Sequence, residues 1–226
     1  MDKTARWLQK TLAYQFQDPA LLEEAMTHRS AGRHNNERLE FLGDAVLDFV
    51  VSDIFFSERE EASEGDLSRL RASLVKDTHL AEVAATIGLG EHLILGSGEK
   101  KSGGHRRGSI LADALEALFG AIYVDAGFAA ADGVIRGLFV SLAKELPDSE
   151  DLKDPKSRLQ ETLQGDGYSL PVYNLEKAIG EAHKPAFEVS CRVDALQLKT
   201  PGYGSTRRDA EQEAAAAMLD KISKAQ

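Results

Sequence analysis

The sequence predicts an all-α domain followed by a small α+β domain of α-β-β-β-α order. Helical hydrophobic patterns recur through the first 146 residues, with no convincing strand among them. An acidic, proline-flanked stretch, PDSEDLKDP, follows from Pro147 to Pro155 and is typical of a hinge. Beyond it, alternating apolar and polar residues indicate strands between two further helices. We therefore expect domains at 1–147 and 155–226, joined by a linker at 148–154.

Each domain has a predicted series of elements. The N-terminal stretch MDKTARWLQKTL is typical of an amphipathic helix. Further helices of the first domain are predicted over 19–27, 37–55, 65–73, 77–87, 110–125 and 130–146. The second domain is predicted as helix 155–164, strands 172–179, 186–193 and 196–200, and helix 206–222. Thr206 and Asp209 fit a capping box at the start of the last helix.

Composition restricts the class of protein. With 226 residues, 42% of them hydrophobic and 28% charged, the chain suits a soluble globular protein. No run approaches the length of a membrane span, and the N-terminus does not resemble a signal peptide. The single cysteine, Cys191, lies in a strand-like pattern and is expected to be a buried thiol. A reducing compartment such as the cytoplasm follows.

The net charge of −10 is unevenly distributed. Residues 1–152 hold 16 Lys and Arg against 26 Asp and Glu, whereas residues 153–226 hold 11 of each kind. The acid excess therefore belongs to the first domain. Bulk charge does not exclude a nucleic-acid partner, because phosphate contacts depend on local cations.

Carboxylates lie in two segments that are otherwise strongly apolar. In NNERLEFLGDAVL (35–47), Glu37, Glu40 and Asp44 share a stripe about 60° wide on an ideal helix. In SILADALEALFGAIYV (109–124), Asp113 and Glu116 are neighbours on one helix face, and Gly120 continues that stripe without a side chain. Helices that are apolar nearly all round are buried, and buried carboxylates need a positive partner.

Divalent cations are one candidate for that partner. The donors are all oxygen atoms, with no His or Cys at a matching spacing, so Mg²⁺ is favoured, with Mn²⁺ as a substitute. A pair of such ions suits in-line displacement at phosphorus. In the alternative, the carboxylates form salt bridges with Arg38, Arg69 or Arg71. Asp48 continues the first stripe, and we interpret it as a solvated end of the helix.

Several longer motifs resemble those of the ribonuclease III family. ERLEFLGDAVL (37–47) is similar to the family signature, and supporting matches are FQDPALL (16–22), THRS (27–30), EGDLSRLR (64–71) and LADALEAL (111–118). The tail resembles a double-stranded-RNA-binding domain. Together these matches cover nearly the whole chain in the domain order of bacterial members.

The resemblance implies an endoribonuclease that hydrolyses double-stranded RNA with divalent metal. The expected products carry 5′-phosphate and 3′-hydroxyl ends with a short 3′ overhang. Glu40, Asp113 and Glu116 match the metal-ligand positions of the family. Asp44 and Glu116 match its catalytic positions. Processing of ribosomal RNA precursors and of other structured RNAs, including messenger and transfer RNA, is the implied role.

The resemblance also implies a homodimer whose two sites share one valley. Phe41 matches the residue that inserts into the partner subunit, although its pattern alone fits an ordinary core aromatic equally well. Glu37 and Glu64 match a second tier of acids that line the same cleft.

A candidate phosphate clamp lies in the tail. GYGSTRRDAEQEAAAAM (202–218) opens with glycines and enters a helix near Ser205 or Thr206. A helix N-terminus carries unpaired N–H groups and a partial positive charge, to which Arg207 and Arg208 add two cations. In the alternative, these residues form a solvated charged first turn. The resemblance places Ser205, Arg207 and Arg208 among the RNA-binding residues.

Two further elements of the tail are expected to reach RNA minor grooves. The resemblance assigns Gln160 and Glu161 to one groove and His183, in the strand loop, to the next. Glu211 stands where many such domains have a lysine, and Asp209 is also acidic. We therefore expect a modest affinity that depends strongly on salt.

The glycine-containing stretch GSGEKKSGGHRRG (96–108) lacks the GK[ST] that a nucleotide-binding loop requires, so no nucleotide cofactor is expected. It is either a basic loop near the RNA backbone or a plain connection. For the whole chain, the rival to the nuclease is a non-catalytic double-stranded-RNA-binding regulator. A pure binder has no need of the four acids Glu40, Asp44, Asp113 and Glu116, and a structural bundle has no use for the arginine pair.

Overall fold

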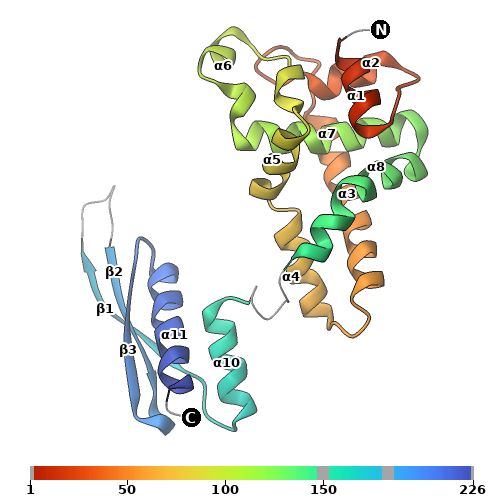
Figure 1. The fold of residues 1–226 in the computed structure, drawn as a ribbon. Coiled ribbons are helices and arrows are strands. Elements are labelled where there is room, and N and C mark those ends of the chain that lie inside the picture. The colour runs from red at the N-terminus through yellow and green to blue at the C-terminus, as the bar shows by residue number, and fades with distance from the viewer. Residues whose placement is uncertain (1–2, 147–152, 180–185, 225–226) are drawn as a thin grey trace. The chain divides into compact units, whose positions relative to one another are not determined.

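The computed structural model describes residues 3–146, 153–179 and 186–224, and the chain divides into two compact units, Met1–Ser149 and Glu150–Gln226. An all-α unit followed by an α-β-β-β-α unit confirms the predicted fold class (Figure 1). Residues 148–152 of the predicted linker lie outside the described residues, so the exact domain boundaries stay a prediction. No helix of the described part is long and apolar enough to cross a membrane.

The regular elements of the first unit are all helices within the described residues, and one isolated bridge joins Thr27 to Ile94. Its elements are α1 Lys3–Leu12, α2 Pro19–Met26, α3 Glu37–Glu58, α4 Glu64–Leu74, α5 Asp77–Thr86, η1 Leu89–His92, α6 Ser97–Lys101, η2 Gly104–Arg106, α7 Gly108–Ala126 and α8 Phe128–Glu145. Segment 96–108 is therefore not a loop without structure, because α6 and η2 lie in it. An ion pair of 2.7 Å between Arg107 and Glu99 folds this segment onto itself.

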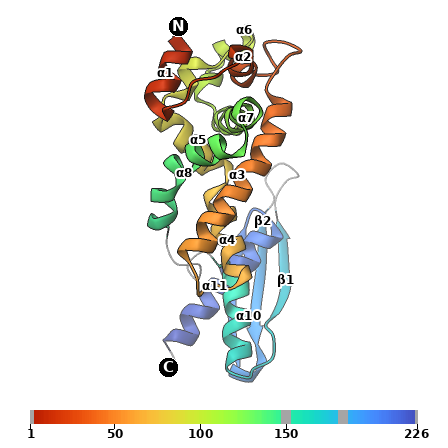
Figure 2. The same cartoon turned by 90° about the vertical axis from the view of Figure 1, so that its right-hand side faces the viewer.

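Helix α7 is the central helix of this unit. Nearly every residue from Ile110 to Ile122 is buried, as expected for a helix that is apolar on all sides. Helices α2, α3, α5 and α8 pack around it. Figure 2 shows α7 close to end-on, with α3 running past it.

Helices α3 and α7 touch through their backbones. A Cβ atom added to Gly43 of α3 would overlap the carbonyl oxygen of Glu116, and one added to Gly120 of α7 would overlap the carbonyl oxygen of Leu39. Leu39 therefore faces Gly120, and Gly43 faces Glu116, which fixes an antiparallel register between the two helices. Any side chain at either glycine would separate the helices.

The second unit is a three-stranded antiparallel sheet with two helices. Its elements are α10 Pro155–Gly165, β1 Val172–Ile179, β2 Ala186–Val193, η3 Asp194–Leu196, β3 Leu198–Gly204 and α11 Arg207–Ser223, and the strand order is β1-β2-β3. Helix α11 packs against the sheet, and α10 packs against α11 (Figure 1). Their shared core contains Leu159 and Leu163 of α10, Met218 of α11, and Cys191, which is buried as predicted.

Strand β3 differs from its prediction, because it begins at Leu198 and continues to Gly204. The predicted strand 196–200 stopped short of the glycines, which resemble a turn in the sequence. In the structure Gly202 is part of the strand, where a Cβ atom would overlap backbone atoms of Ala210 and Ala214 in α11. The missing side chain lets the strand lie directly against the helix.

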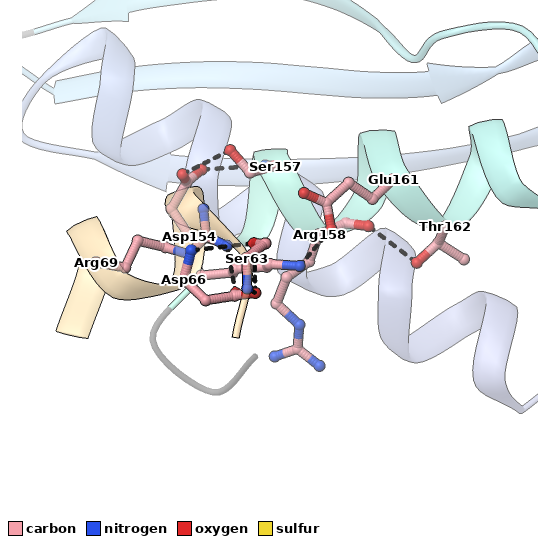
Figure 3. Close-up of polar contacts among 9 residues, drawn as sticks. Ser63, Asp66, Arg69, Asp154, Ser157, Arg158, Glu161 and Thr162 are labelled. Atoms are coloured by element: carbon pink, nitrogen blue, oxygen red, sulfur yellow. Dashed lines mark hydrogen bonds and ion pairs between the residues drawn. The ribbon is translucent and has the colours of Figure 1, made fainter. Parts of the chain in front are cut away.

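Side-chain caps begin several helices. In α4, Ser63 and Asp66 form a capping box, and Arg69 pairs with Asp66 at 2.7 Å (Figure 3). In α10, the Asp154 carboxylate accepts hydrogen bonds from the backbone N–H of Ser157 and from its hydroxyl (Figure 3). The predicted Thr206–Asp209 capping box of α11 is confirmed, but the helix begins at Arg207. Such caps satisfy N–H groups that otherwise lack partners.

We expect Gly43→Ala to lower the free energy of unfolding by on the order of 3 kcal/mol, because the added methyl group meets the backbone of α7 rather than a movable side chain. Chemical denaturation measures this change. Gly133→Ala in α8 is the matched control, since a Cβ atom there meets nothing within 4 Å. That control should stabilise the protein by about 1 kcal/mol. Equal effects of the two substitutions would refute the close contact.

Candidate active site

Four carboxylates lie along the contact between α3 and α7. Glu40 and Asp44 flank Gly43 on α3, while Asp113 and Glu116 precede Gly120 on α7, so the register of the glycine contact brings the two pairs together. Glu40, Asp113 and Glu116 are half-buried, and Asp44 is exposed. The four acids named by the sequence therefore belong to one site.

Glu116 has the most strongly shifted pKa of these acids. Burial raises its pKa, and the negative charges of Asp44, Glu40, Asp113 and Asp77 raise it further, to about 8. This carboxyl group is therefore surrounded by like charge. Without a cation, the Glu116 carboxyl group therefore favours its protonated form at neutral pH.

Two other half-buried acids of this group, Glu40 and Asp113, also have raised pKa values. Burial raises the pKa of Glu40, and the charges of Asp113, Glu37 and Asp44 add to that shift while Arg29 opposes it. Burial likewise raises the pKa of Asp113. Carboxylates from both helices thus interact electrostatically across the contact.

Two of the three arginines proposed as alternative partners, Arg69 and Arg71, are engaged elsewhere. Arg69 pairs with Asp66, and Arg71 donates to the hydroxyl of Ser52 at 3.1 Å. Among the described residues, no ion pair joins Arg38, Arg69 or Arg71 to the four acids. The positive charge near the site comes instead from Arg29, which the sequence did not indicate.

Arg29 sits in a turn that is attached to the segment before α6. The backbone N–H of His28 donates to the Ile94 carbonyl at 3.0 Å, and the backbone N–H of Gly96 donates to the Ser30 hydroxyl at 3.0 Å. His28 is buried, and its Nδ1 accepts from the backbone N–H of Ser30. These bonds hold Arg29 where its charge opposes the rise in the pKa of Asp113.

Asp77 is a further acid that sequence reasoning missed. It begins α5, and its charge raises the pKa of both Asp113 and Glu116. Its sequence setting, KDTHL, resembles an ordinary helix start. Only the packing of α5 against α7 shows that this carboxylate faces the site.

The secondary acids occupy different surroundings. Glu37 is exposed at the start of α3 and lies 3.6 Å from Arg29. Glu64 begins α4 and lines a recess with Asp48 and Arg71, so the structure does not group it with Asp113 or Glu116. The interpretation of Asp48 as a solvated helix end was wrong. It lies mid-helix, where burial raises its pKa and Arg71 opposes the shift.

The chemistry of the donor set fits a hard divalent cation. Every donor is a carboxylate oxygen, and a cation would relieve the repulsion that raises these pKa values. Within the described residues, however, no three His, Cys, Asp or Glu side chains converge closely enough to hold a metal by themselves. The acids therefore form a negatively charged cluster rather than a preassembled coordination cage.

The residues expected to bind RNA all belong to the second unit. Gln160 and Arg208 line one recess between α10 and α11. Glu161 is exposed and pairs with Lys153 at 2.6 Å. The hydroxyl of Ser205 donates to Asp209 at 3.0 Å. His183 lies outside the described residues.

Comparisons with known proteins give the same division of the chain. Residues 18–142 match the family model described as ribonuclease-III-like, and residues 155–222 match the double-stranded RNA binding motif. Ribonuclease 3 of Aromatoleum aromaticum is 52% identical over 96% of this chain and 96% of its own length. Ribonuclease 3 of Hahella chejuensis is 54% identical over 92% of each.

Solved structures resemble the helical unit. The nuclease domain of ribonuclease III from Campylobacter jejuni has a TM-score of 0.60 and 42% sequence identity, and the match covers 65% of this chain and all of that domain. A second structure of that domain, described as flexible in a region involved in dimer formation, has a TM-score of 0.57 and 45% identity. It matches over 59% of this chain and 96% of its own.

We expect the metal-free protein to lose stability as pH rises, because Glu116 binds its proton more tightly in the folded state than in the unfolded state. This contribution is fully present below the ordinary pKa of 4.5 and is lost as pH rises through about 8. Urea denaturation in EDTA, from about pH 5 to about pH 9, measures the dependence. Glu116→Gln should reduce this dependence of stability on pH, whereas Glu23→Gln, at an exposed position of α2, should leave it unchanged. An unchanged profile in Glu116→Gln would contradict the assignment.

Proposed function

The chain belongs to the ribonuclease III family of double-strand-specific endoribonucleases, and we propose that it cuts duplex RNA at the α3–α7 carboxylates in a Mg²⁺-dependent reaction. Mn²⁺ is the expected substitute. The products carry 5′-phosphate and 3′-hydroxyl ends with short 3′ overhangs. The observation that carries the proposal is the placement of four acids from two helices side by side, where burial and the neighbouring negative charges together raise the pKa of Glu116 to about 8.

Each acid has a proposed role. Glu40, Asp113 and Glu116 would hold the metal, since these half-buried carboxylates gain most from a cation. Mg²⁺ at this site would supply a polarised water and neutralise charge on the reacting phosphate. Asp44 is exposed beside them, so its carboxylate can orient an attacking water and accept its proton. The water oxygen would bond to phosphorus as the bond to the 3′ oxygen breaks, and the 3′ oxygen would leave as a hydroxyl after taking a proton from solvent.

Glu116→Gln should abolish cleavage and preserve RNA binding, because the amide keeps the shape of the side chain but loses the ligand charge. Mapping the ends of a labelled duplex with and without Mg²⁺ measures cleavage, and a gel-shift assay in EDTA measures binding. The matched control, Glu23→Gln, should cut normally. Full cleavage by Glu116→Gln would contradict the metal site, and wild-type protein that binds without cutting would favour the non-catalytic regulator.

The second unit supplies RNA affinity in this proposal. Arg207 and Arg208 stand at the N-terminus of α11, where backbone N–H groups and the helix dipole favour phosphate. Gln160 lies in the same recess as Arg208, which supports its assignment to the RNA face. Ser205 and Glu161 belong to that face by resemblance, as does His183.

We further propose that the protein acts as a homodimer through α3. The core alternative for Phe41 was wrong in the single chain, because its side chain is 80% exposed. Phe49 and Phe56 are also exposed on α3, at 61% and 71%. Contiguous exposed aromatic side chains are typical of an interface. Phe49 and Phe56 border a recess that Leu67 and Arg71 of α4 also line, which offers a receptor for the Phe41 of a second copy.

Phe41→Ala should shift the protein from dimer to monomer at low concentration and reduce paired cutting of both strands, because an aromatic anchor is lost from each side of the interface. Analytical ultracentrifugation measures the association. Val124→Ala is the control, since Val124 is 51% exposed on α7. A monomeric wild-type protein, or an unchanged dimer of Phe41→Ala, would refute the proposed contact.

The biological setting follows from the family. We propose processing of ribosomal RNA precursors and of structured messenger and transfer RNA as its role. A cytoplasmic location, expected from the single reduced cysteine, is part of the same proposal.

A further inference from the structure

We propose that Lys156, at the start of α10, is the third cation of the RNA phosphate clamp. Lys156 would contact an RNA phosphate in place of residue 211, which is a lysine in many such domains but is Glu211 in this chain. This inference rests on the proposed role of Arg207 and Arg208. It concerns a residue on a different helix from theirs, 51 positions or more before them in the chain.

Glu211 does not face the RNA as an isolated negative charge. One of its oxygens, Oε2, lies 2.6 Å from Lys156 Nζ, and the other, Oε1, lies 2.9 Å from Arg207 Nε. Its side chain is only 14% exposed. Burial opposes its ionisation, but hydrogen bonds from the two cations outweigh burial and lower its pKa. The carboxylate therefore joins two cations from two helices.

Lys156 is both held in place and accessible. Its Nζ lies 4.5 Å from the centroid of the Tyr173 ring, a cation–π contact. Its backbone N–H donates to the Gln212 side chain at 3.0 Å. Its side chain is nevertheless 32% exposed. A cation that is already ordered loses less side-chain entropy when it binds a phosphate.

The surrounding charges favour an anion. Lys156 and Arg208 line the same recess, together with Gln160, which is also a predicted RNA contact. Asp154 also lines it, but its carboxylate caps α10 and accepts from the Gln212 amide at 2.8 Å. The cations Lys156, Arg207 and Arg208 equal in number the nearby acids Asp154, Asp209 and Glu211. The partial positive charge of the α11 N-terminus therefore makes the local balance favourable to an anion.

Asp209 is the other acid that the sequence analysis expected to reduce RNA affinity, and it also has a structural role. Its carboxylate accepts from the backbone N–H of Thr206 and the hydroxyl of Ser205, and these bonds lower its pKa. Both acids near the clamp are thus engaged by neighbouring groups. The reduced affinity expected from them is offset by the lysine on α10.

The test is the salt dependence of duplex-RNA binding by the full chain in EDTA, so that the RNA stays intact. Lys156→Gln should weaken binding uniformly across duplex sequences and lower the slope of log K against log salt concentration by about 0.9. Lys156→Arg should keep the slope. The matched control is Lys199→Gln, because Lys199 pairs with Glu176 at 2.8 Å in the same unit but belongs to β3.

A double variant separates phosphate contact from simple neutralisation of Glu211. If Lys156 only masks that carboxylate, Lys156→Gln with Glu211→Gln should restore wild-type affinity and slope, which would overturn the proposal. The proposal expects the slope to stay low, and the double variant leaves no unpaired buried charge to disturb folding. Thermal unfolding of each variant checks the fold.

The outcomes also distinguish this inference from the function on which it rests. Wild-type protein that fails to bind the duplex would refute the RNA-binding face itself. Wild-type binding with an unchanged slope in Lys156→Gln would refute the role of Lys156 alone.

Discussion

The backbone contact between α3 and α7 is the constraint on which the active site depends. Gly43 and Gly120 let the two helices approach until carbonyl groups of one touch the other. At that separation, Glu40 and Asp44 lie near Asp113 and Glu116. The contact buries Glu116 and brings like charges together, and both effects raise the pKa of Glu116. Folding alone leaves this repulsion unrelieved, so the site is poised to gain free energy from a cation.

Acidic side chains have different surroundings in the two units. In the helical unit, the four carboxylates at the α3–α7 contact lie together, and among the described residues no ion pair joins them to a cation, which suits a site for a divalent metal. In the second unit, Asp154, Asp209 and Glu211 are all engaged by caps or cations, which leaves positive charge toward solvent. A chain with a net charge of −10 can therefore bind a polyanion, because recognition depends on the local arrangement of charge.

Helix α3 contributes both to the core of the helical unit and to its proposed functional surfaces. One face of this helix buries Leu47 and Val50 completely against the rest of the unit, which anchors it firmly. A second face presents Phe41, Phe49 and Phe56 to solvent, where a partner subunit can cover them. The acid stripe lies on the same helix. In the proposed dimer, metal binding, dimerisation and the core would share one rigid element, so that association of two subunits would place two sites at a fixed separation.

The sequence alone determined the fold class, most helix bounds and the four central acids, because periodicity, caps and the signature motif depend on residues close together in the chain. It identified Gly120 as a gap in the acid stripe but not Gly43 as its counterpart. The inclusion of Gly202 in β3, the approach of Asp77 to Glu116 and the pairing of Lys156 with Glu211 were decided by tertiary structure. Each depends on the distance between segments far apart in sequence, and packing of whole helices and strands sets that distance.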